Sequence, residues 1–234
     1  MVMIEPPLPP VRSTEEWPAR GGVWTYDTWG RHGRPVLLIP AVLFDRVTWW
    51  PAAADLRPHA TVVAADLPGH GGSDPRLRYE PDELVDDLAG LIAALDVPLA
   101  PIVVGHGSSA GLATLFATRY AVHALVTVDA DDSFALDRDR YLQTMNLDAL
   151  PAPYRNLVDV ADEPRLLRDY AACIRIRPHP DPPSTARHAR LAIRSRPPAD
   201  PDPGDCRMNI YDVPGRFAHL IDVDRFVCDI KRLL

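Results

Sequence analysis

The sequence has little of what marks secreted and membrane proteins. Its 234 residues include only 3 cysteines, far apart, which form neither a disulfide framework nor a zinc-ligand spacing. No apolar run approaches the roughly 18 residues of a membrane span, and the opening residues MVMIEPPLPP lack the basic and apolar regions of a signal peptide. We therefore expect a cytoplasmic protein with free thiols and no membrane partner.

Clustered positive charge is also missing. Lys and Arg number 25 against 32 Asp and Glu, which makes the formal net charge 25 − 32 = −7, and no basic run occurs. Nucleic acids and acidic membranes are bound mainly through such clusters, so neither is an expected partner. The sequence contains no metal-ligand cluster and no dinucleotide fingerprint. We expect neither a metal nor another cofactor.

Glycine is scarce, with 13 residues, whereas proline is abundant, with 26. Half of the prolines fall in two stretches, 1–18 and 178–203. Proline lacks an amide hydrogen and disfavours helix in the residue before it, which predicts irregular surface chain in both stretches. We treat residues 1–22 as a Pro-rich N-terminal arm. Because 47% of the chain is hydrophobic, the remainder can bury the core of one large domain.

Short apolar runs recur along the rest of the chain. Continuous runs of this length are typical of strands buried on both faces of a parallel sheet. They occupy residues 36–39, 61–65, 102–104 and 124–128. A half-exposed antiparallel strand is predicted over 23–29, and two late strands over 190–194 and 208–213.

Helical patterns lie between these strands. One follows Pro81, another follows Gly111, and a third closes the chain after Asp222, a candidate N-cap. Alternating strands and helices predict an α/β fold with a mostly parallel, doubly wound sheet.

Four segments, in order, resemble the α/β-hydrolase superfamily. They are VLLIPAVLFD (36–45), DLPGHGGSD (66–74), VGHGSSAG (104–111) and VPGRFAH (213–219). In that family they supply one oxyanion-hole amide, the turn after the next strand, the nucleophile elbow and the histidine loop. The resemblance implies an α/β-hydrolase fold whose core comprises 23–130 and 188–234, with a small helical cap formed by 131–187.

Hydrophobic stripes at helical spacing predict the helices of this cap. Their residues are Leu142, Met145, Leu147 and Leu150, then Leu157 and Val160, then Leu166, Leu167, Tyr170 and Ile174.

The elbow departs from the family pattern, which is Gly-His-Ser-x-Gly-Gly. An alignment without gaps puts Gly107, directly after His106, in the place of the nucleophile. A second alignment fits GxSxG over 107–111 and makes Ser109 the nucleophile. Ser108 is a third possibility if the turn slips by one residue. A structural alternative is that both serines cap the following helix.

The resemblance also suggests the partners of the nucleophile. His219 lies on the expected histidine loop and would be the catalytic base. Asp200 or Asp202, which follow a late strand, would orient it, and Asp129 at the end of an earlier strand is the alternative. The amides of Val42 and of the residue after the elbow, Ser108, would form an oxyanion hole.

Apolar residues near that loop favour a hydrophobic ligand. Leu43 and Phe44 are predicted to line a pocket, and Trp49 and Trp50 to pack against the sheet. His106 could approach the pocket, although a structural role beneath the elbow is the simpler interpretation.

The resemblance implies an enzyme that hydrolyses, or transfers the acyl group of, a hydrophobic ester, thioester or lactone. One alternative is a cyclase, lyase or isomerase that uses His219 without a nucleophilic serine. Another is an inactive protein that only binds its ligand.

Overall fold

The described residues, 12–130, 135–176, 188–198 and 206–234 of a computed structural model, form one sheet of eight strands in the order β1-β2-β4-β3-β5-β6-β7-β8. The strands are β1 (Arg12–Ala19), β2 (Gly22–Trp29), β3 (Pro35–Ile39), β4 (Thr61–Ala65), β5 (Ile102–His106), β6 (Ala124–Val128), β7 (Ala189–Arg194) and β8 (Arg207–Ile210). Pairings from β4 through β8 are parallel, whereas β2 pairs antiparallel with β1 and β4. The predicted mostly parallel sheet is confirmed.

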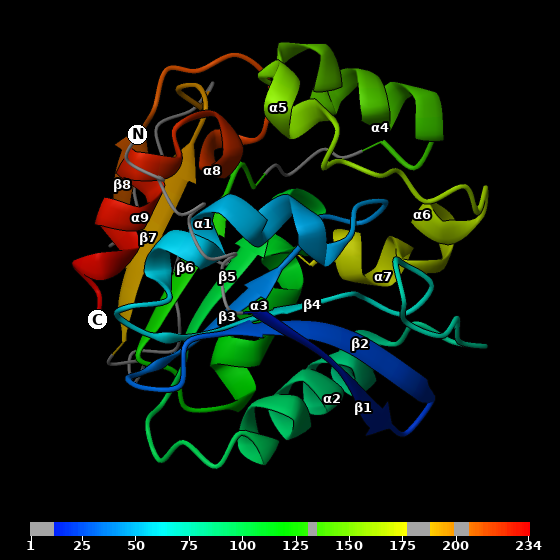
Figure 1. Cartoon of the computed structure of the whole chain (residues 1–234). Helices are drawn as coiled ribbons and strands as arrows, with labels where there is room; N and C mark the ends of the chain where they lie inside the picture. The colour runs from blue at the N-terminus through cyan, green and yellow to red at the C-terminus, as the bar shows by residue number, and fades with distance from the viewer. Residues whose placement is uncertain (1–11, 131–134, 177–187, 199–205) are drawn as a thin grey trace, which may run out of the picture.

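Helices cover both faces of this sheet (Figure 1). They are α1 (Trp50–Leu56), α2 (Pro81–Ala94), α3 (Ala110–Arg119), α4 (Arg138–Met145), α5 (Ala152–Arg155), α6 (Leu166–Asp169), α7 (Ala171–Ile174), α8 (Ala218–Ile221) and α9 (Val223–Lys231). Side chains alternate between the faces of a strand. In β3, Leu37 therefore packs with α2 and α3, whereas Leu38 packs with α1 and α9.

The N-terminal region differs from the prediction. We expected an irregular arm over residues 1–22, but residues 12–19 form β1, which pairs with β2 along its whole length. Pro18 is compatible with this strand because β1 is at the edge of the sheet, where a missing amide hydrogen costs no ladder bond. β2 is also more buried than the half-exposed strand that we expected.

Most of the strands and helices predicted in the core are confirmed. β4 and β6 have the predicted bounds, α2 begins at Pro81, and α9 follows Asp222 as expected. α3 begins at Ala110, one residue before the glycine that was expected to precede it, and β8 covers Arg207–Ile210, so the strand expected over 208–213 ends three residues early. The Asp222 carboxylate caps α9 by accepting a hydrogen bond from the Arg225 amide.

The segment between β6 and β7, here called the inserted segment (residues 135–176), contains only short helices. The predicted helical stripe at Leu157 and Val160 is wrong, because Val160 instead forms an isolated bridge with Phe44. α4 ends at Met145, and its C-cap residue Asn146 has a φ of 53°. Prolines 151 and 164 interrupt the chain that follows, and Pro153 lies in the first turn of α5.

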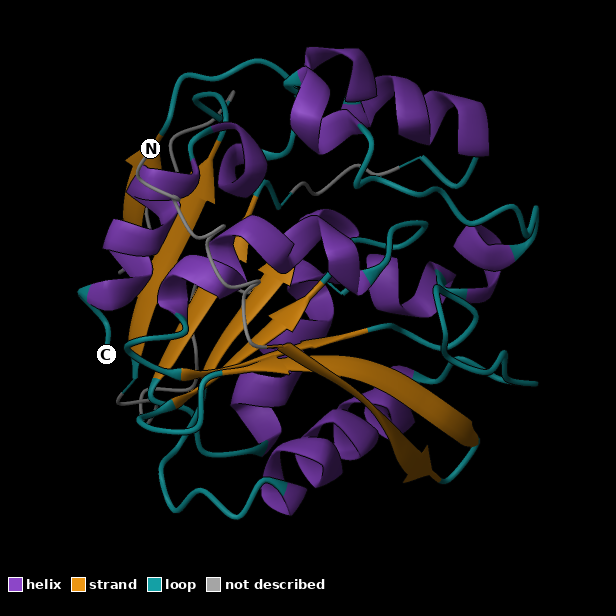
Figure 2. Cartoon of the chain, in the orientation of Figure 1, coloured by secondary structure: helices purple, strands orange, loops and turns teal. Residues whose placement is uncertain are grey.

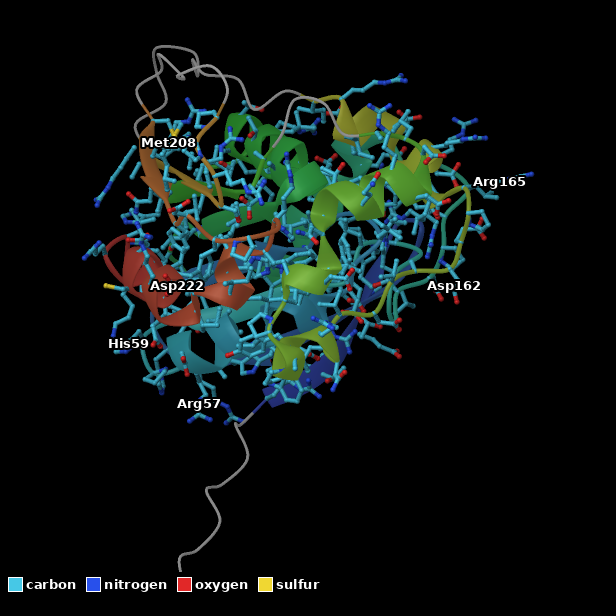
Figure 3. The ribbon with its side chains drawn as sticks, turned by 90° about the horizontal axis from the view of Figure 1, so that it is seen from above. Arg57, His59, Asp162, Arg165, Met208 and Asp222 are labelled. Carbon is cyan, nitrogen blue, oxygen red and sulfur yellow. The ribbon has the colours of Figure 1, made fainter. Side chains whose placement is uncertain are left out.

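The inserted segment lies over one end of the sheet. The arrowheads of the central strands point toward the side on which α4 and α5 lie (Figure 2). Viewed from that side in Figure 3, Asp162 and Arg165 of the inserted segment are at one margin of the molecule, and Met208 and Asp222 are at the opposite one. Ligand sites of open α/β sheets form outside the carboxyl ends of the strands. No helix in the described ranges is long and apolar enough to cross a membrane.

Candidate active site

The turn after β5 has Gly107 at the point where the strand ends. His106, the last residue of β5, is extended (φ −94°, ψ 135°), and Gly107 follows with a φ of 53°. Within the described stretch 102–119, no other residue has a positive φ. Glycine adopts this conformation more readily than any other residue, and the nucleophile elbow is a strained strand-to-helix turn of this kind. The residue with a positive φ in this turn is thus Gly107 rather than Ser108 or Ser109.

The Ser108 hydroxyl connects two segments that are distant in sequence. Its Oγ accepts a hydrogen bond from the Val42 amide at 2.9 Å and lies 2.9 Å from the hydroxyl of Tyr141 on α4. All three residues are buried. The amide that we expected in an oxyanion hole therefore already has an acceptor within the protein.

Ser109 is buried in a different way. Its side chain is fully buried, and its Oγ has no hydrogen-bond partner among the described residues. Neither Ser108 nor Ser109 caps α3 with its side chain, so the predicted capping role is not found. Buried hydroxyls nearly always have a partner, which makes the environment of Ser109 unusual.

His219 lies in α8 and is completely buried. In the described part of the chain, neither ring nitrogen makes a hydrogen bond of normal geometry, although the main chain of Thr48 lies near enough to the ring to raise its pKa. The imidazole packs against Trp49, with ring centroids 4.0 Å apart, and against His106 at 4.6 Å. Burial lowers the pKa of His219 well below its usual value of 6.5, His106 lowers it further, and the main chain of Thr48 partly offsets this. The ring is therefore neutral at pH 7 and has one nitrogen that can accept a proton.

Contacts with the inserted segment and with β5 hold the loop that leads into α8. The Arg216 amide donates to the Met145 carbonyl at 3.2 Å, and Nε2 of His106 donates to the Arg216 carbonyl at 2.7 Å. Gly215 has a φ of 76°, and a Cβ at this position would lie 3.1 Å from a carbonyl oxygen of the inserted segment. The loop can approach the inserted segment this closely because residue 215 has no side chain.

Asp129 binds main chain next to His219 rather than its imidazole. Its Oδ1 accepts from the Ser195 amide at 2.6 Å, and its Oδ2 accepts from the Ser195 hydroxyl at 2.8 Å and from the Ala218 amide at 3.1 Å. The carboxylate therefore fixes the residue that precedes His219. Its charge also raises the pKa of His106, although burial has the larger effect and lowers it.

The loop after β3 has an unusual backbone at Leu43, whose φ is 77°. The Leu43 amide donates to Nε2 of the buried His70 at 2.9 Å, and its carbonyl accepts from the Ala161 amide at 2.9 Å. Burial lowers the pKa of His70 to about 4. His70 is therefore a neutral acceptor that supports the loop between Val42 and Phe44.

Phe44 and Leu43, the residues predicted to line a pocket, are both buried. The Phe44 ring packs edge-on against Phe217 with centroids 5.2 Å apart, and lies 6.5 Å from the ring of Tyr141. Apolar side chains from the loop after β3, from α4 and from the histidine loop are thus in contact close to Ser108.

Comparison with known proteins shows the family. A family model described as the alpha/beta hydrolase fold matches residues 34–197, which is more than half of the chain. The chain belongs to the α/β hydrolase fold family. The match includes the first three of the four sequence segments and ends before the histidine loop. The predicted hydrolase-superfamily membership is confirmed.

Two sequence relatives match parts of this hydrolase-fold chain. A 2-(acetamidomethylene)succinate hydrolase from Mesorhizobium japonicum is 33% identical over 123 residues, which are 51% of this chain and 41% of that protein. An uncharacterized protein of Mycobacterium tuberculosis is 36% identical over 101 residues, or 42% of this chain and 29% of that protein. The chain spans less than half the length of either relative.

Solved structures of the family are similar over nearly the whole chain. The structure of an E-2-(acetamidomethylene)succinate hydrolase has a TM-score of 0.75 at 18% identity and covers 95% of this chain and 99% of its own. A thermophilic esterase from Thermogutta terrifontis has a TM-score of 0.72 at 17% identity, with 94% of this chain and 97% of its own covered. At these identities the likeness shows the fold.

Two of the predicted acids of this hydrolase-fold chain, Asp200 and Asp202, lie outside the described residues. Among the side chains that are described, no group of three or more His, Cys, Asp or Glu is arranged to hold a metal ion.

Three residues at the site were not predicted to belong to it. Trp49 packs in the sheet core as expected but also against His219. Tyr141 is four residues before Met145, and both are fully buried, so helical spacing could have identified it. Ser195 directly follows a predicted strand, and its amide and hydroxyl both donate to Asp129.

Proposed function

We propose that the protein hydrolyses an apolar carbonyl compound (an ester, thioester or lactone) with His219 as general base toward water and without an acyl-enzyme intermediate. The observation that carries this proposal is a glycine at the turn after β5 together with a buried imidazole that has no hydroxyl partner in the described chain. The water oxygen bonds to the carbonyl carbon while its proton moves to His219. The bond to the leaving group then breaks, and the leaving group takes this proton.

The electrostatic state of His219 supports the role of base. Its lowered pKa keeps the imidazole neutral at pH 7, and only the neutral ring accepts a proton. Asp129 holds the Ala218 amide and so acts as a positioning residue through the main chain.

The surroundings support an apolar carbonyl substrate. The amides of Val42 and Ser108 would stabilise the negative charge that develops on the carbonyl oxygen. Leu43 and Phe44 would contact the apolar part of the substrate, and the inserted segment would act as a cap that excludes water. Two similar proteins are named as hydrolases, which supports hydrolysis as the reaction class.

A second route is favoured by the environment of Ser109. Its hydroxyl is buried and has no partner in the described residues. It would be available to attack a bound substrate, with His219 taking the hydroxyl proton. In this route Ser109 would form an ester with the acyl group before water releases it.

The test is turnover of p-nitrophenyl acetate, butyrate and octanoate by the wild type and by His219→Gln, Ser109→Ala and His123→Gln. General-base hydrolysis predicts a loss of about 10² to 10⁴-fold in His219→Gln, full activity in Ser109→Ala, and full activity in the control, since His123 is exposed. Loss of activity in Ser109→Ala, together with labelling by an alkyl fluorophosphonate, would establish the covalent route instead.

The remaining alternatives have distinct outcomes. A cyclase, lyase or isomerase would leave no heavy oxygen in its product after reaction in heavy-oxygen water. A ligand-binding protein would turn over none of the esters, and His219→Gln would change nothing.

We place the protein in a reducing compartment, the cytoplasm. Cys173 and Cys228 are free thiols among the described residues, which fits the reducing conditions of the cytoplasm. A small molecule is the partner that this proposal requires.

A further inference from the structure

One buried oxygen atom, Oγ of Ser108, is held by groups from two different segments. The Val42 amide on the loop after β3 donates to it at 2.9 Å, and the Tyr141 hydroxyl on α4 lies 2.9 Å away. Ser108 is 3% exposed and Val42 and Tyr141 are 0% exposed. Groups that are 66 and 33 residues away in sequence thus meet at a single acceptor.

This arrangement has the dimensions of an oxyanion hole. Donors in such holes lie about 2.7–3.1 Å from the oxygen that they stabilise. A hydroxyl oxygen has two lone pairs and can accept from both groups at once. Burial raises the pKa of Tyr141 far above its usual value of 10, so its phenol stays protonated at neutral pH and retains a hydrogen to donate.

We propose that the Ser108 hydroxyl occupies, in the free protein, the position of the substrate's carbonyl oxygen, and that the substrate displaces it and then accepts hydrogen bonds from the Val42 amide and the Tyr141 hydroxyl. Tyr141 is thereby assigned as a substrate-binding donor on the inserted segment, and Ser108 as an internal competitor of the substrate. This inference rests on the proposed action on a carbonyl compound.

Physical reasons favour such a displaceable hydroxyl. A buried amide without an acceptor is costly, so the free protein needs an oxygen next to Val42. A serine hydroxyl moves between staggered rotamers without any change in the main chain. The Ser108 backbone, held in the 3-10 turn Gly107–Ser109, would stay in place while its Oγ leaves. The inserted segment would contact the reacting oxygen directly through Tyr141.

The inference predicts opposite effects for the two side chains. In Ser108→Ala the Val42 amide has no internal acceptor, so KM for p-nitrophenyl butyrate should fall about tenfold while kcat is retained. In Tyr141→Phe one donor to the developing oxyanion is lost, so kcat should fall about tenfold to a hundredfold while KM changes little. If Ser108→Ala does not fold, Ser108→Gly removes the same hydroxyl.

Two matched variants separate these effects from lost stability. Tyr170→Phe removes another buried tyrosine hydroxyl, which donates to the Pro68 carbonyl at 2.8 Å. Ser73→Ala removes another buried serine hydroxyl, which donates to the Asp66 carbonyl at 2.8 Å. Both should lower the melting temperature without changing kcat or KM.

A binding measurement keeps the test independent of turnover. Butyrate, a carboxylate that presents an oxygen to the same donors, is titrated into ¹⁵N-labelled protein while the Val42 amide resonance is followed. The inference predicts a downfield shift of the amide proton that saturates at about tenfold lower butyrate concentration in Ser108→Ala than in the wild type.

The outcomes distinguish this inference from the proposed hydrolysis. A butyrate-dependent Val42 shift without ester turnover would support the displaced hydroxyl and contradict hydrolysis. Turnover that depends on His219, with equal butyrate affinity in Ser108→Ala and wild type, would contradict the inference alone. It would also be overturned by the absence of any Val42 shift, by a kcat unchanged in Tyr141→Phe, or by a kcat that falls in Ser108→Ala.

Discussion

Trp49 packs against His219 with ring centroids 4.0 Å apart and an angle of 33° between the ring planes. The indole also lies 5.7 Å from Phe226 of α9, whose ring is 6.1 Å from that of His219. Trp49 is therefore the nearest of the aromatic side chains whose packing buries His219, and this burial lowers the pKa of the imidazole.

Trp49→Phe should shift the pH dependence of activity. The smaller ring leaves room for water beside His219, so the pKa of the imidazole rises toward its usual value and the acidic limb of kcat/KM moves to higher pH. Stability should fall by about 1–3 kcal/mol. Trp50→Phe is the control, because Trp50 is half-buried and packs under Arg12. An unchanged pH profile in Trp49→Phe would contradict this account.

Gly107→Ser should create a nucleophile where the family pattern has one. A serine at a φ of 53° carries backbone strain of about 1–2 kcal/mol, which should appear in chemical denaturation. If His219 faces this position, the variant gains covalent labelling by an alkyl fluorophosphonate, as seen by intact mass. Gly107→Ala carries the same strain and should not be labelled. A Gly107→Ser variant that folds but is not labelled would contradict this prediction, because it would show that His219 does not activate a hydroxyl at this position.

Asp129→Asn should weaken the link between β6, β7 and the histidine loop. The carboxylate accepts three hydrogen bonds. In the variant, the amide nitrogen that replaces one carboxylate oxygen is itself a donor, so at least one of these hydrogen bonds is lost. We expect a loss of about 2–4 kcal/mol in the free energy of unfolding and a lower kcat. Ser195→Ala, which removes the hydroxyl donor alone, should cost about 1 kcal/mol. If urea denaturation gave the same loss in the free energy of unfolding for Asp129→Asn and Ser195→Ala, the role assigned to the Asp129 carboxylate would be contradicted.

His70 should make the protein less stable in mild acid. The unfolded chain protonates this imidazole below about pH 6.5, whereas the folded protein does so only below about 4. The unfolded state therefore binds more protons between these values, and stability falls as the pH is lowered through them, by about 3 kcal/mol in total. His70→Gln should flatten this part of the pH-stability curve, whereas the exposed His123→Gln should leave it unchanged.

Asp45 should have the opposite pH dependence. Burial and the neighbouring charges of Asp66 and Asp159 raise its pKa to about 6, so the folded state binds more protons between about pH 4 and 6 and stability falls as pH rises. Asp45→Asn keeps an oxygen for the Val47 amide that it caps but removes the charge. The variant should gain on the order of 1 kcal/mol above pH 6, after allowance for solvent screening, and nothing below pH 4. A loss of stability at pH 8 would contradict the assigned pKa.

Local sequence patterns predicted most of the sheet because its strands are apolar on both faces. β4 and β6 contain no charged residue and one threonine each, and all of their residues are buried, so their bounds follow directly. β1 was missed because an edge strand needs no apolar run. Its residues RSTEEWPA are mostly exposed and depend on β2 for their conformation. Local patterns also failed to predict the short helices of the inserted segment, since contacts with the core hold these helices.

The amino-acid sequence by itself determined the family and the order of the elements, because these depend on local composition and on the order of motifs. Only the tertiary structure decided which groups meet at the turn. Ser108, Val42 and Tyr141 come from separate elements, and Asp129 contacts the main chain beside His219 rather than its ring. Hydrogen-bond partners depend on distances between elements, and the packing of the whole sheet sets those distances.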